Sequence, residues 1–122
     1  MSAAGSPLVV NRVHRDAAVS EASRRDATTP GARVAHFDFV KGADNRRLMT
    51  ALIYLNDDYE GGETEFVRTG LKIKGKTGDV ILFRNDGDDT GPNPNSEHAG
   101  LPVTKGAKYL ATRWIREERW IP

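Results

Sequence analysis

The chain has 122 residues, enough for one small domain, and a formal net charge of +1. This near neutrality gives no electrostatic case for a nucleic acid or an anionic membrane as partner. Cysteine is absent, so disulfides and thiolate metal sites are excluded, and any metal would be held by nitrogen and oxygen atoms. No apolar run approaches the roughly 20 residues of a membrane helix, and residues 1–6 lack a signal-peptide pattern, so a cytoplasmic protein is expected.

Residues 1–30 differ in composition from the rest of the chain, because they are rich in Ala, Ser, Arg and Asp. The apolar positions of Ala17–Arg25 are mostly Ala, which predicts at most a weak helix. We therefore expect residues 1–30 to be poorly ordered or loosely docked. The turn signal Thr29-Pro30-Gly31 separates this segment from a second unit, residues 31–122.

The remaining chain predicts a mainly β domain of short strands. Leu48–Leu55 is a continuous apolar run, and its period alone would also fit a buried helix. Its length and the Asn56-Asp57-Asp58 that ends it favour a strand. Other strands are expected over Arg33–Val40, Leu71–Lys74, Asp79–Phe83 and Tyr109–Arg116, with a turn and short strand over Gly61–Val67 and a loop over 84–95. Gly75–Gly78 predicts a hairpin-like connection, and the whole pattern is typical of a sandwich or jelly roll.

Three candidate metal ligands occur at a distinctive spacing. His36 and Asp38 are separated by one residue in a strand-like run, so both side chains would lie on the same face. His98 would join them from a different strand. Two histidines and one carboxylate form the facial triad of non-haem Fe(II) oxygenases. The His-x-Asp pattern of His36 and Asp38 also occurs at His14-Arg15-Asp16. That stretch has no alternating apolar flanks, so we interpret the match as chance.

A lysine follows the last of these ligands at the start of the final strand-like run. Lys108 would share one strand face with Leu110, Thr112 and Trp114. An ammonium group that faces the interior is costly unless it meets an anion. A dicarboxylate would supply that anion and leave its other end free to chelate the metal. Thr112 and Trp114 could line the same cavity.

Four segments together resemble the prolyl 4-hydroxylase-like 2-oxoglutarate/Fe(II) dioxygenases over about residues 30–120. They are Leu48–Phe66, which contains Tyr-Leu-Asn-Asp-Asp-Tyr-Glu-Gly-Gly-Glu-Thr, Leu71–Phe83, Pro94–Val103, which contains Ser-Glu-His-Ala-Gly, and Lys105–Ile115. The resemblance implies a double-stranded β-helix, or jelly roll, which we expect to be incomplete. It also implies that 2-oxoglutarate is decarboxylated to succinate while a C–H bond of a peptidyl-proline or small-molecule substrate is hydroxylated.

The resemblance also implies roles for individual residues. The iron ligands would be His36, Asp38 and His98, and the co-substrate pocket would contain Lys108, Thr64, Trp114 and Tyr54. The lysine would pair with the distal carboxylate of 2-oxoglutarate, whose keto-acid end would chelate Fe(II). Ascorbate is a further candidate cofactor. Substrate choice is expected in the loops 41–47, 56–62 and 84–95.

The chain departs from the family pattern before the first iron ligand. The segment before His36 is shorter than usual, the stretch Pro30–His36 is shorter by one residue, and Thr28 and Thr29 stand where a tyrosine commonly helps to bind 2-oxoglutarate. A missing edge strand would favour a homodimer through an exposed sheet edge. Two alternatives therefore stay open: a catalytically inactive, shortened remnant that binds a metal or a partner, and a cupin-like module that binds a sugar or another small molecule.

Overall fold

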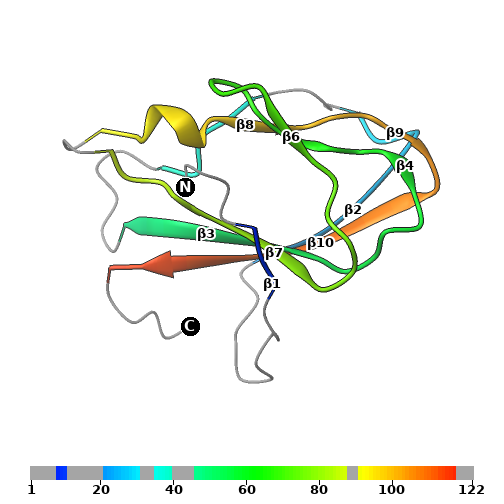
Figure 1. Cartoon of the computed structure of the whole chain (residues 1–122), viewed down its shortest axis with the longest axis horizontal. Helices are drawn as coiled ribbons and strands as arrows, with labels where there is room; N and C mark the ends of the chain where they lie inside the picture. The colour runs from blue at the N-terminus through cyan, green and yellow to red at the C-terminus, as the bar shows by residue number, and fades with distance from the viewer. Residues whose placement is uncertain (1–7, 11–20, 31–34, 40–45, 88–90, 118–122) are drawn as a thin grey trace.

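The computed structural model describes residues 8–10, 21–30, 35–39, 46–87 and 91–117 (Figure 1). Within these ranges the regular structure is β apart from one short 3-10 helix at Pro94–Ser96, and every pair of strands is antiparallel. The prediction of a mainly β fold is confirmed. None of the described helical residues makes a segment long and apolar enough to cross a bilayer.

The larger layer is a sheet whose strands follow the order β1-β7-β3-β10-β2. Their bounds are Leu8–Val10 (β1), Glu21–Asp26 (β2), Arg47–Tyr54 (β3), Asp79–Arg84 (β7) and Ala107–Arg116 (β10). β3 and β10 pair at the centre, with Thr50 opposite Trp114 and Tyr54 opposite Leu110. Because opposite residues of an antiparallel pair lie on the same face, these four side chains share one face of the sheet.

Two small sheets form the second layer, which lies across from the large sheet in Figure 1. One has the order β6-β5-β8 and the other pairs β4 with β9. Their bounds are Glu60–Gly61 (β4), Thr64–Phe66 (β5), Leu71–Ile73 (β6), His98–Gly100 (β8) and Val103–Lys105 (β9). Apolar side chains from both layers pack into one cluster, made of Leu52, Tyr54, Phe66, Ile81 and Phe83 with Ile73 and Leu110 against it.

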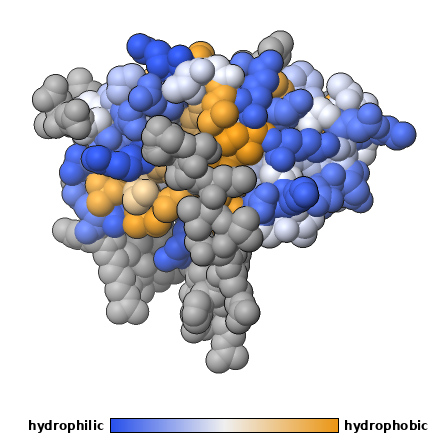
Figure 2. Space-filling view, in the orientation of Figure 1, coloured by the Kyte–Doolittle hydropathy of each residue, from blue (hydrophilic) through white to orange (hydrophobic). Residues whose placement is uncertain are grey.

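The central strand β3 is buried on both faces. Leu52 and Tyr54 belong to the cluster between the layers, whereas Ala51 and Ile53 join a second buried cluster on the opposite face, with Val80 and Ala111. This double burial explains why the sequence there is a continuous apolar run instead of an alternating one, and the strand prediction is confirmed. Figure 2 shows that apolar side chains also reach the surface among polar ones on the face viewed there.

Residues 21–30 differ from the expected poorly ordered or helical segment. Residues 21–26 form β2, and each of them has a partner on β10 in the large sheet. β2 lies last in the strand order, most of its side chains are polar, and none of them is buried. Backbone pairing with β10 therefore holds this strand, and such pairing leaves no apolar pattern in the sequence. Apart from β1, the earlier part of the N-terminal segment lies outside the described residues.

The hairpin expected at Gly75–Gly78 is also wrong. β6 pairs with β5, whereas β7 pairs with β3 and β1, so the connection crosses from one layer to the other. At the crossing, the Gly78 N–H donates to the Tyr54 carbonyl at 2.7 Å. A Cβ atom at Gly75 would lie 2.5 Å from Cδ2 of Tyr54, so only glycine fits against this ring. The glycine-rich segment Gly75–Gly78 therefore does more than form a turn, because Gly75 packs against the buried ring of Tyr54.

Candidate metal and co-substrate site

The three candidate metal ligands meet in the structure. The ligand atoms of His36, Asp38 and His98 all lie within 4.8 Å of one another. His36 and His98 form an isolated antiparallel bridge, in which each backbone N–H donates to the other residue's carbonyl at 2.9 and 3.1 Å. This bridge is the one strand-like position in residues 35–39, so the strand expected over Arg33–Val40 is not formed in its described part. The histidines are brought together by backbone pairing, and Asp38 follows at a bend.

The two carboxylate oxygens of Asp38 have different partners. Oδ2 accepts hydrogen bonds from Thr50 Oγ1 at 2.7 Å and from Trp114 Nε1 at 3.3 Å. Oδ1 faces the histidines, 3.5 Å from His36 Nε2 and 3.8 Å from His98 Nε2. The first oxygen orients the carboxylate, and the second is placed to coordinate an ion.

The ring of His98 is oriented by the backbone. Its Nδ1 lies 2.7 Å from the carbonyl oxygen of Ser96, and because a carbonyl only accepts, Nδ1 carries the proton. The lone pair is then on Nε2, which faces Asp38. The aromatic rings of Phe66 and Phe83 lie with their centroids 5.8 and 5.0 Å from the His98 ring. These rings give the site an apolar wall.

The surroundings hold the ligands in the protonation states that a metal needs. Burial alone would raise the pKa of Asp38, but the hydrogen bond from His36, the charge of His98 and the hydrogen bonds from Thr50 and Trp114 lower it to about 2. Burial lowers the pKa of His98 below its usual 6.5, against an opposing effect of Asp38. At neutral pH the site therefore offers a carboxylate and a neutral imidazole, which are the forms that bind metals.

The donor set fits a divalent transition metal. Two imidazole nitrogens and one carboxylate oxygen on one side suit Fe(II) and leave three octahedral positions open. Adjacent ligands of an octahedral ion with bonds of roughly 2.1 Å lie roughly 3 Å apart. The distances of 3.5 and 3.8 Å from Asp38 Oδ1 to the two histidines are slightly longer, and a small movement of the side chains would close them on an ion.

Lys108 lies inside the molecule and is 3% exposed. Its Nζ donates to the Gly62 carbonyl at 2.6 Å and lies 5.5 Å from the centroid of the Tyr54 ring. Burial and the charge of Arg25 lower the pKa of Lys108 to about 8, while Glu63 opposes the shift. A buried ammonium without a carboxylate in contact is the arrangement expected of an anion site.

Tyr54 and Thr64 form a hydroxyl pair near this lysine. Their oxygens are 2.8 Å apart, and both residues are buried, at 0% and 3% exposure. Burial raises the pKa of Tyr54, so the phenol keeps its proton at neutral pH. The pair joins β3 in the large sheet to β5 in the small one. These hydroxyls can donate to or accept from a polar ligand held by Lys108.

The sequence reasoning missed residues that support the metal ligands. Thr50 is fully buried and bonds to Asp38, and Nδ2 of the equally buried Asn85 donates to Thr50 Oγ1 at 2.9 Å. The Ser96 carbonyl orients His98. The sequence does distinguish Thr50, because it is the only polar residue inside the apolar run Leu48–Ile53. Asn85 and the Ser96 carbonyl act through contacts that only the tertiary structure creates.

Comparison with known proteins identifies relatives of the chain. The family model of the 2OG-Fe(II) oxygenase superfamily matches residues 11–116. A protein of Acanthamoeba polyphaga mimivirus described as a putative prolyl 4-hydroxylase is 41% identical over 76 residues, which are 62% of this chain and 31% of the relative. Prolyl 4-hydroxylase 1 of Arabidopsis thaliana is 37% identical over 86 residues, covering 60% of this chain and 30% of the relative. The chain thus spans about a third of the length of these curated relatives.

Solved structures show the same fold. The viral collagen prolyl hydroxylase of Paramecium Bursaria Chlorella virus-1 matches with a TM-score of 0.69 and 33% identity, over 80% of this chain and 54% of that protein. Its 2OG complex matches with a TM-score of 0.66 and 34% identity, over 78% of this chain and 55% of that protein. The β fold, with its two facing antiparallel layers, is therefore that of a jelly-roll-type oxygenase. By its sequence and its fold, this chain belongs to the 2OG-Fe(II) oxygenase superfamily.

Proposed function

We propose that the chain is the β-core of an Fe(II)- and 2-oxoglutarate-dependent hydroxylase of the prolyl 4-hydroxylase type. The observation that carries this proposal is the meeting of His36, Asp38 and His98 in a fold that also buries Lys108. His36, Asp38 and His98 would hold Fe(II). Lys108 would bind the distal carboxylate of 2-oxoglutarate.

Side chains and one backbone carbonyl of the chain itself prepare this site for its reaction. Thr50 and Trp114 hold one oxygen of Asp38, so the other oxygen stays directed at the metal position. The Ser96 carbonyl keeps the proton of His98 on Nδ1 and its lone pair on Nε2. The bound iron and 2-oxoglutarate would supply the oxidative chemistry, in which decarboxylation to succinate is coupled to hydroxylation of a C–H bond.

The co-substrate would be positioned by the buried polar groups of the pocket. Lys108 would bind the distal carboxylate by charge, and the hydroxyls of Tyr54 and Thr64 would complete its hydrogen bonds. Because Lys108 is 3% exposed, this interaction would form away from competing water. The keto-acid end would then reach the metal in one orientation. Placement of this kind is the contribution that a protein makes to a cofactor reaction.

The substrate class follows from the relatives and stays a proposal. The matched proteins are named as prolyl 4-hydroxylases and as a collagen prolyl hydroxylase, so a peptidyl proline is the first substrate to test, with small molecules next. The segments 56–62 and 84–95, which connect strands of the two layers, are proposed to select the substrate.

Anaerobic absorption spectroscopy tests the proposal directly. Fe(II) and then 2-oxoglutarate would be added to the purified protein, and we expect a visible charge-transfer band when the keto acid chelates the iron. The band should disappear in His98→Ala. After admission of oxygen, succinate should form in the original protein and not in His36→Ala, Asp38→Ala or His98→Ala. A folded protein without the band would support a module that binds a metal or a partner without turnover, and the hydroxylase proposal would be wrong.

A further inference from the structure

The pairing of β2 with β10 places a second cation beside Lys108. Arg25 is the direct cross-strand partner of Lys108 in this antiparallel pair. Directly opposite residues lie on the same face, so Arg25 is on the face that carries Lys108 and Leu110, and Leu110 packs against the core between the layers. Two like charges at such a position destabilise a sheet. Their juxtaposition therefore needs a reason.

Neither cation is neutralised by an ion pair in the described part of the chain. Lys108 Nζ donates to the Gly62 carbonyl, and the half-buried Arg25 has no ion pair with a described carboxylate. Glu63 is the acidic group whose charge acts on Lys108, but it does not form an ion pair with it. Charges withdrawn from water are costly unless a counter-charge meets them, so this corner of the molecule favours an anion.

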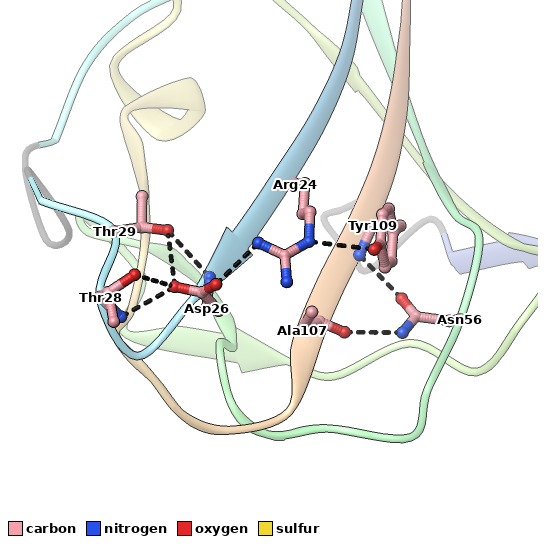
Figure 3. Close-up of polar contacts among 7 residues, drawn as sticks. All are labelled: Arg24, Asp26, Thr28, Thr29, Asn56, Ala107 and Tyr109. Atoms are coloured by element: carbon pink, nitrogen blue, oxygen red, sulfur yellow. Dashed lines mark hydrogen bonds and ion pairs between the residues drawn. The ribbon is translucent and has the colours of Figure 1, made fainter.

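The neighbouring Arg24 provides a contrast on the same strand. Its side chain lies on the opposite face of β2, where Nε donates to the Tyr109 hydroxyl at 3.0 Å and Nη1 to Asp26 Oδ2 at 2.7 Å (Figure 3). Figure 3 shows its guanidinium between these two side chains. Arg24 is thus occupied by partners of its own strand pair. Arg25 has the same charge and no such partners among the residues that the structure describes.

A buried hydroxyl next to this corner also lacks a partner. Tyr59 is 3% exposed, and its phenolic oxygen makes no hydrogen bond with any described residue. Its ring edge and the stem of Lys108 both flank Gly62, where a Cβ atom would lie 3.0 Å from Tyr59 Cε1 and 3.3 Å from Lys108 Cδ. A buried hydroxyl without a partner needs an explanation, and binding of a polar ligand is one. The ring that carries this hydroxyl lies beside the same glycine as the Lys108 stem.

We propose that Arg25 and Lys108 together bind the distal carboxylate of 2-oxoglutarate, as a two-cation site built across the β2–β10 pair. The inference rests on the proposed function and adds a residue to it. The planar guanidinium can bind a carboxylate with two parallel hydrogen bonds, and the lysine adds a point charge. The second cation would replace the tyrosine that commonly precedes the Pro-Gly turn in this family, where this chain has Thr28 and Thr29.

Calorimetric titration of the anaerobic Fe(II)-loaded protein tests this inference with two ligands. 2-Oxoglutarate carries the distal carboxylate, whereas 2-oxobutanoate has the same keto-acid end without it. We expect Arg25→Gln to weaken binding of 2-oxoglutarate about tenfold to a hundredfold, as for loss of a charged hydrogen bond, and to leave 2-oxobutanoate within about twofold. Arg24→Gln is the matched control, because it removes the same charge from the opposite face and should change neither affinity. Arg25→Lys should restore part of the affinity.

The outcomes separate this inference from the proposed function. Equal 2-oxoglutarate affinities for Arg25→Gln and Arg24→Gln would overturn the role of Arg25. In that case the proposed function would still stand if Lys108→Gln lost its binding of 2-oxoglutarate. Absence of 2-oxoglutarate binding in the original protein would refute the proposed function and this inference with it. Circular dichroism of each variant checks that a loss of affinity does not come from unfolding.

Discussion

At the scale of single residues, the two carboxylate oxygens of Asp38 have different roles: one fixes the orientation of the side chain and the other is placed to coordinate the metal. One carboxylate oxygen is held by Thr50 and Trp114, and the other faces both histidines. Thr50 in turn accepts a hydrogen bond from Asn85. Such supporting contacts keep a ligand in one orientation, so the ion does not have to order it on binding.

Thr50→Val tests this support. The change keeps the shape of the side chain but removes the hydrogen bond to Asp38 and leaves the buried Asn85 amide without an acceptor. We expect the affinity for Fe(II) or Mn(II) to fall roughly tenfold to a hundredfold in a metal titration, as for other supporting residues. Thr112→Val is the control, because Thr112 is a buried threonine of β10 that makes no hydrogen bond to the triad in the described part of the chain. Equal losses in both variants would contradict the role of Thr50.

The charge of Lys108 should destabilise the protein when no co-substrate is bound. Its pKa is lowered from 10.5 to about 8 by burial and Arg25, against Glu63, so the protonated lysine costs about 3 kcal/mol below pH 8. Between pH 8 and 10.5 the unfolded chain binds more protons at this lysine than the folded protein does. The free energy of unfolding therefore rises with pH through that range, and the cost of the buried charge is relieved. Lys108→Met should therefore increase the free energy of unfolding at pH 7, and the gain should shrink at pH 9.5.

Urea unfolding at the two pH values measures this effect. Lys105→Met is the control, because the Lys105 side chain is 82% exposed and its charge costs little. The groups that face Lys108 are Arg25, Glu63 and the rings of Tyr54 and Tyr59, and they are unchanged in both variants. A gain from Lys108→Met that did not depend on pH would attribute the effect to packing and not to charge.

At the scale of elements, the segment between β6 and β7 is fitted to the core. It crosses between the layers and passes Tyr54, which bonds to Thr64 on the opposite sheet. Gly75→Ala would place a methyl group 2.5 Å from the Tyr54 ring. We expect a loss of stability of about 1–3 kcal/mol, as for other overpacked cores, measured by chemical denaturation.

Gly100→Ala is the matched control for this substitution. Gly100 lies on β8, and an added Cβ there would have no atom within 4 Å. The control should change stability by less than about 0.5 kcal/mol. If Gly75→Ala were equally neutral, Tyr54 would be free to move, and its proposed place in the co-substrate pocket would lose its structural basis.

At the scale of the whole molecule, metal binding should stabilise the fold. The triad joins the residue 35–39 segment to β8 through the His36–His98 bridge, so an ion would tie together parts that are distant in the chain. A ligand present at a hundred times its dissociation constant adds about 2.7 kcal/mol to the stability of the folded state. The thermal unfolding temperature should rise with Mn(II) or Zn(II), and this rise should vanish in Asp38→Ala.

The chain supplies its own control for that measurement. His14-Arg15-Asp16 repeats the His-x-Asp pattern of His36 and Asp38. Asp16→Ala should keep the metal-dependent rise if the second motif is a chance match. If Asp16→Ala abolished the metal-dependent rise in the unfolding temperature and Asp38→Ala did not, the metal site would have to be assigned to His14 and Asp16 instead.

Several features of the fold and site follow from local sequence alone. The apolar run forms most of β3, as its length and its abrupt polar end favour a strand over a helix. Tyr109–Arg116 is part of β10, and the glycine-rich stretch before Thr64 leads into β5. The types of the three metal ligands and the buried lysine were also readable, because few residue types can perform that chemistry. These features depend on residues that are close together in the chain or on side-chain chemistry.

Other features were decided by pairing between distant strands, which local sequence does not encode. β2 carries polar side chains and is held by backbone bonds to β10, so its sequence predicted at most a weak helix where the structure has a strand. The same pairing sets Arg25 opposite Lys108. The crossing at Gly75–Gly78 and the bonds of Asp38 to Thr50 and Trp114 likewise arise only when the two layers meet. Sequence by itself determined which chemical groups are present, and the tertiary structure decided their neighbours, because each contact requires long stretches of chain to fold back in one register.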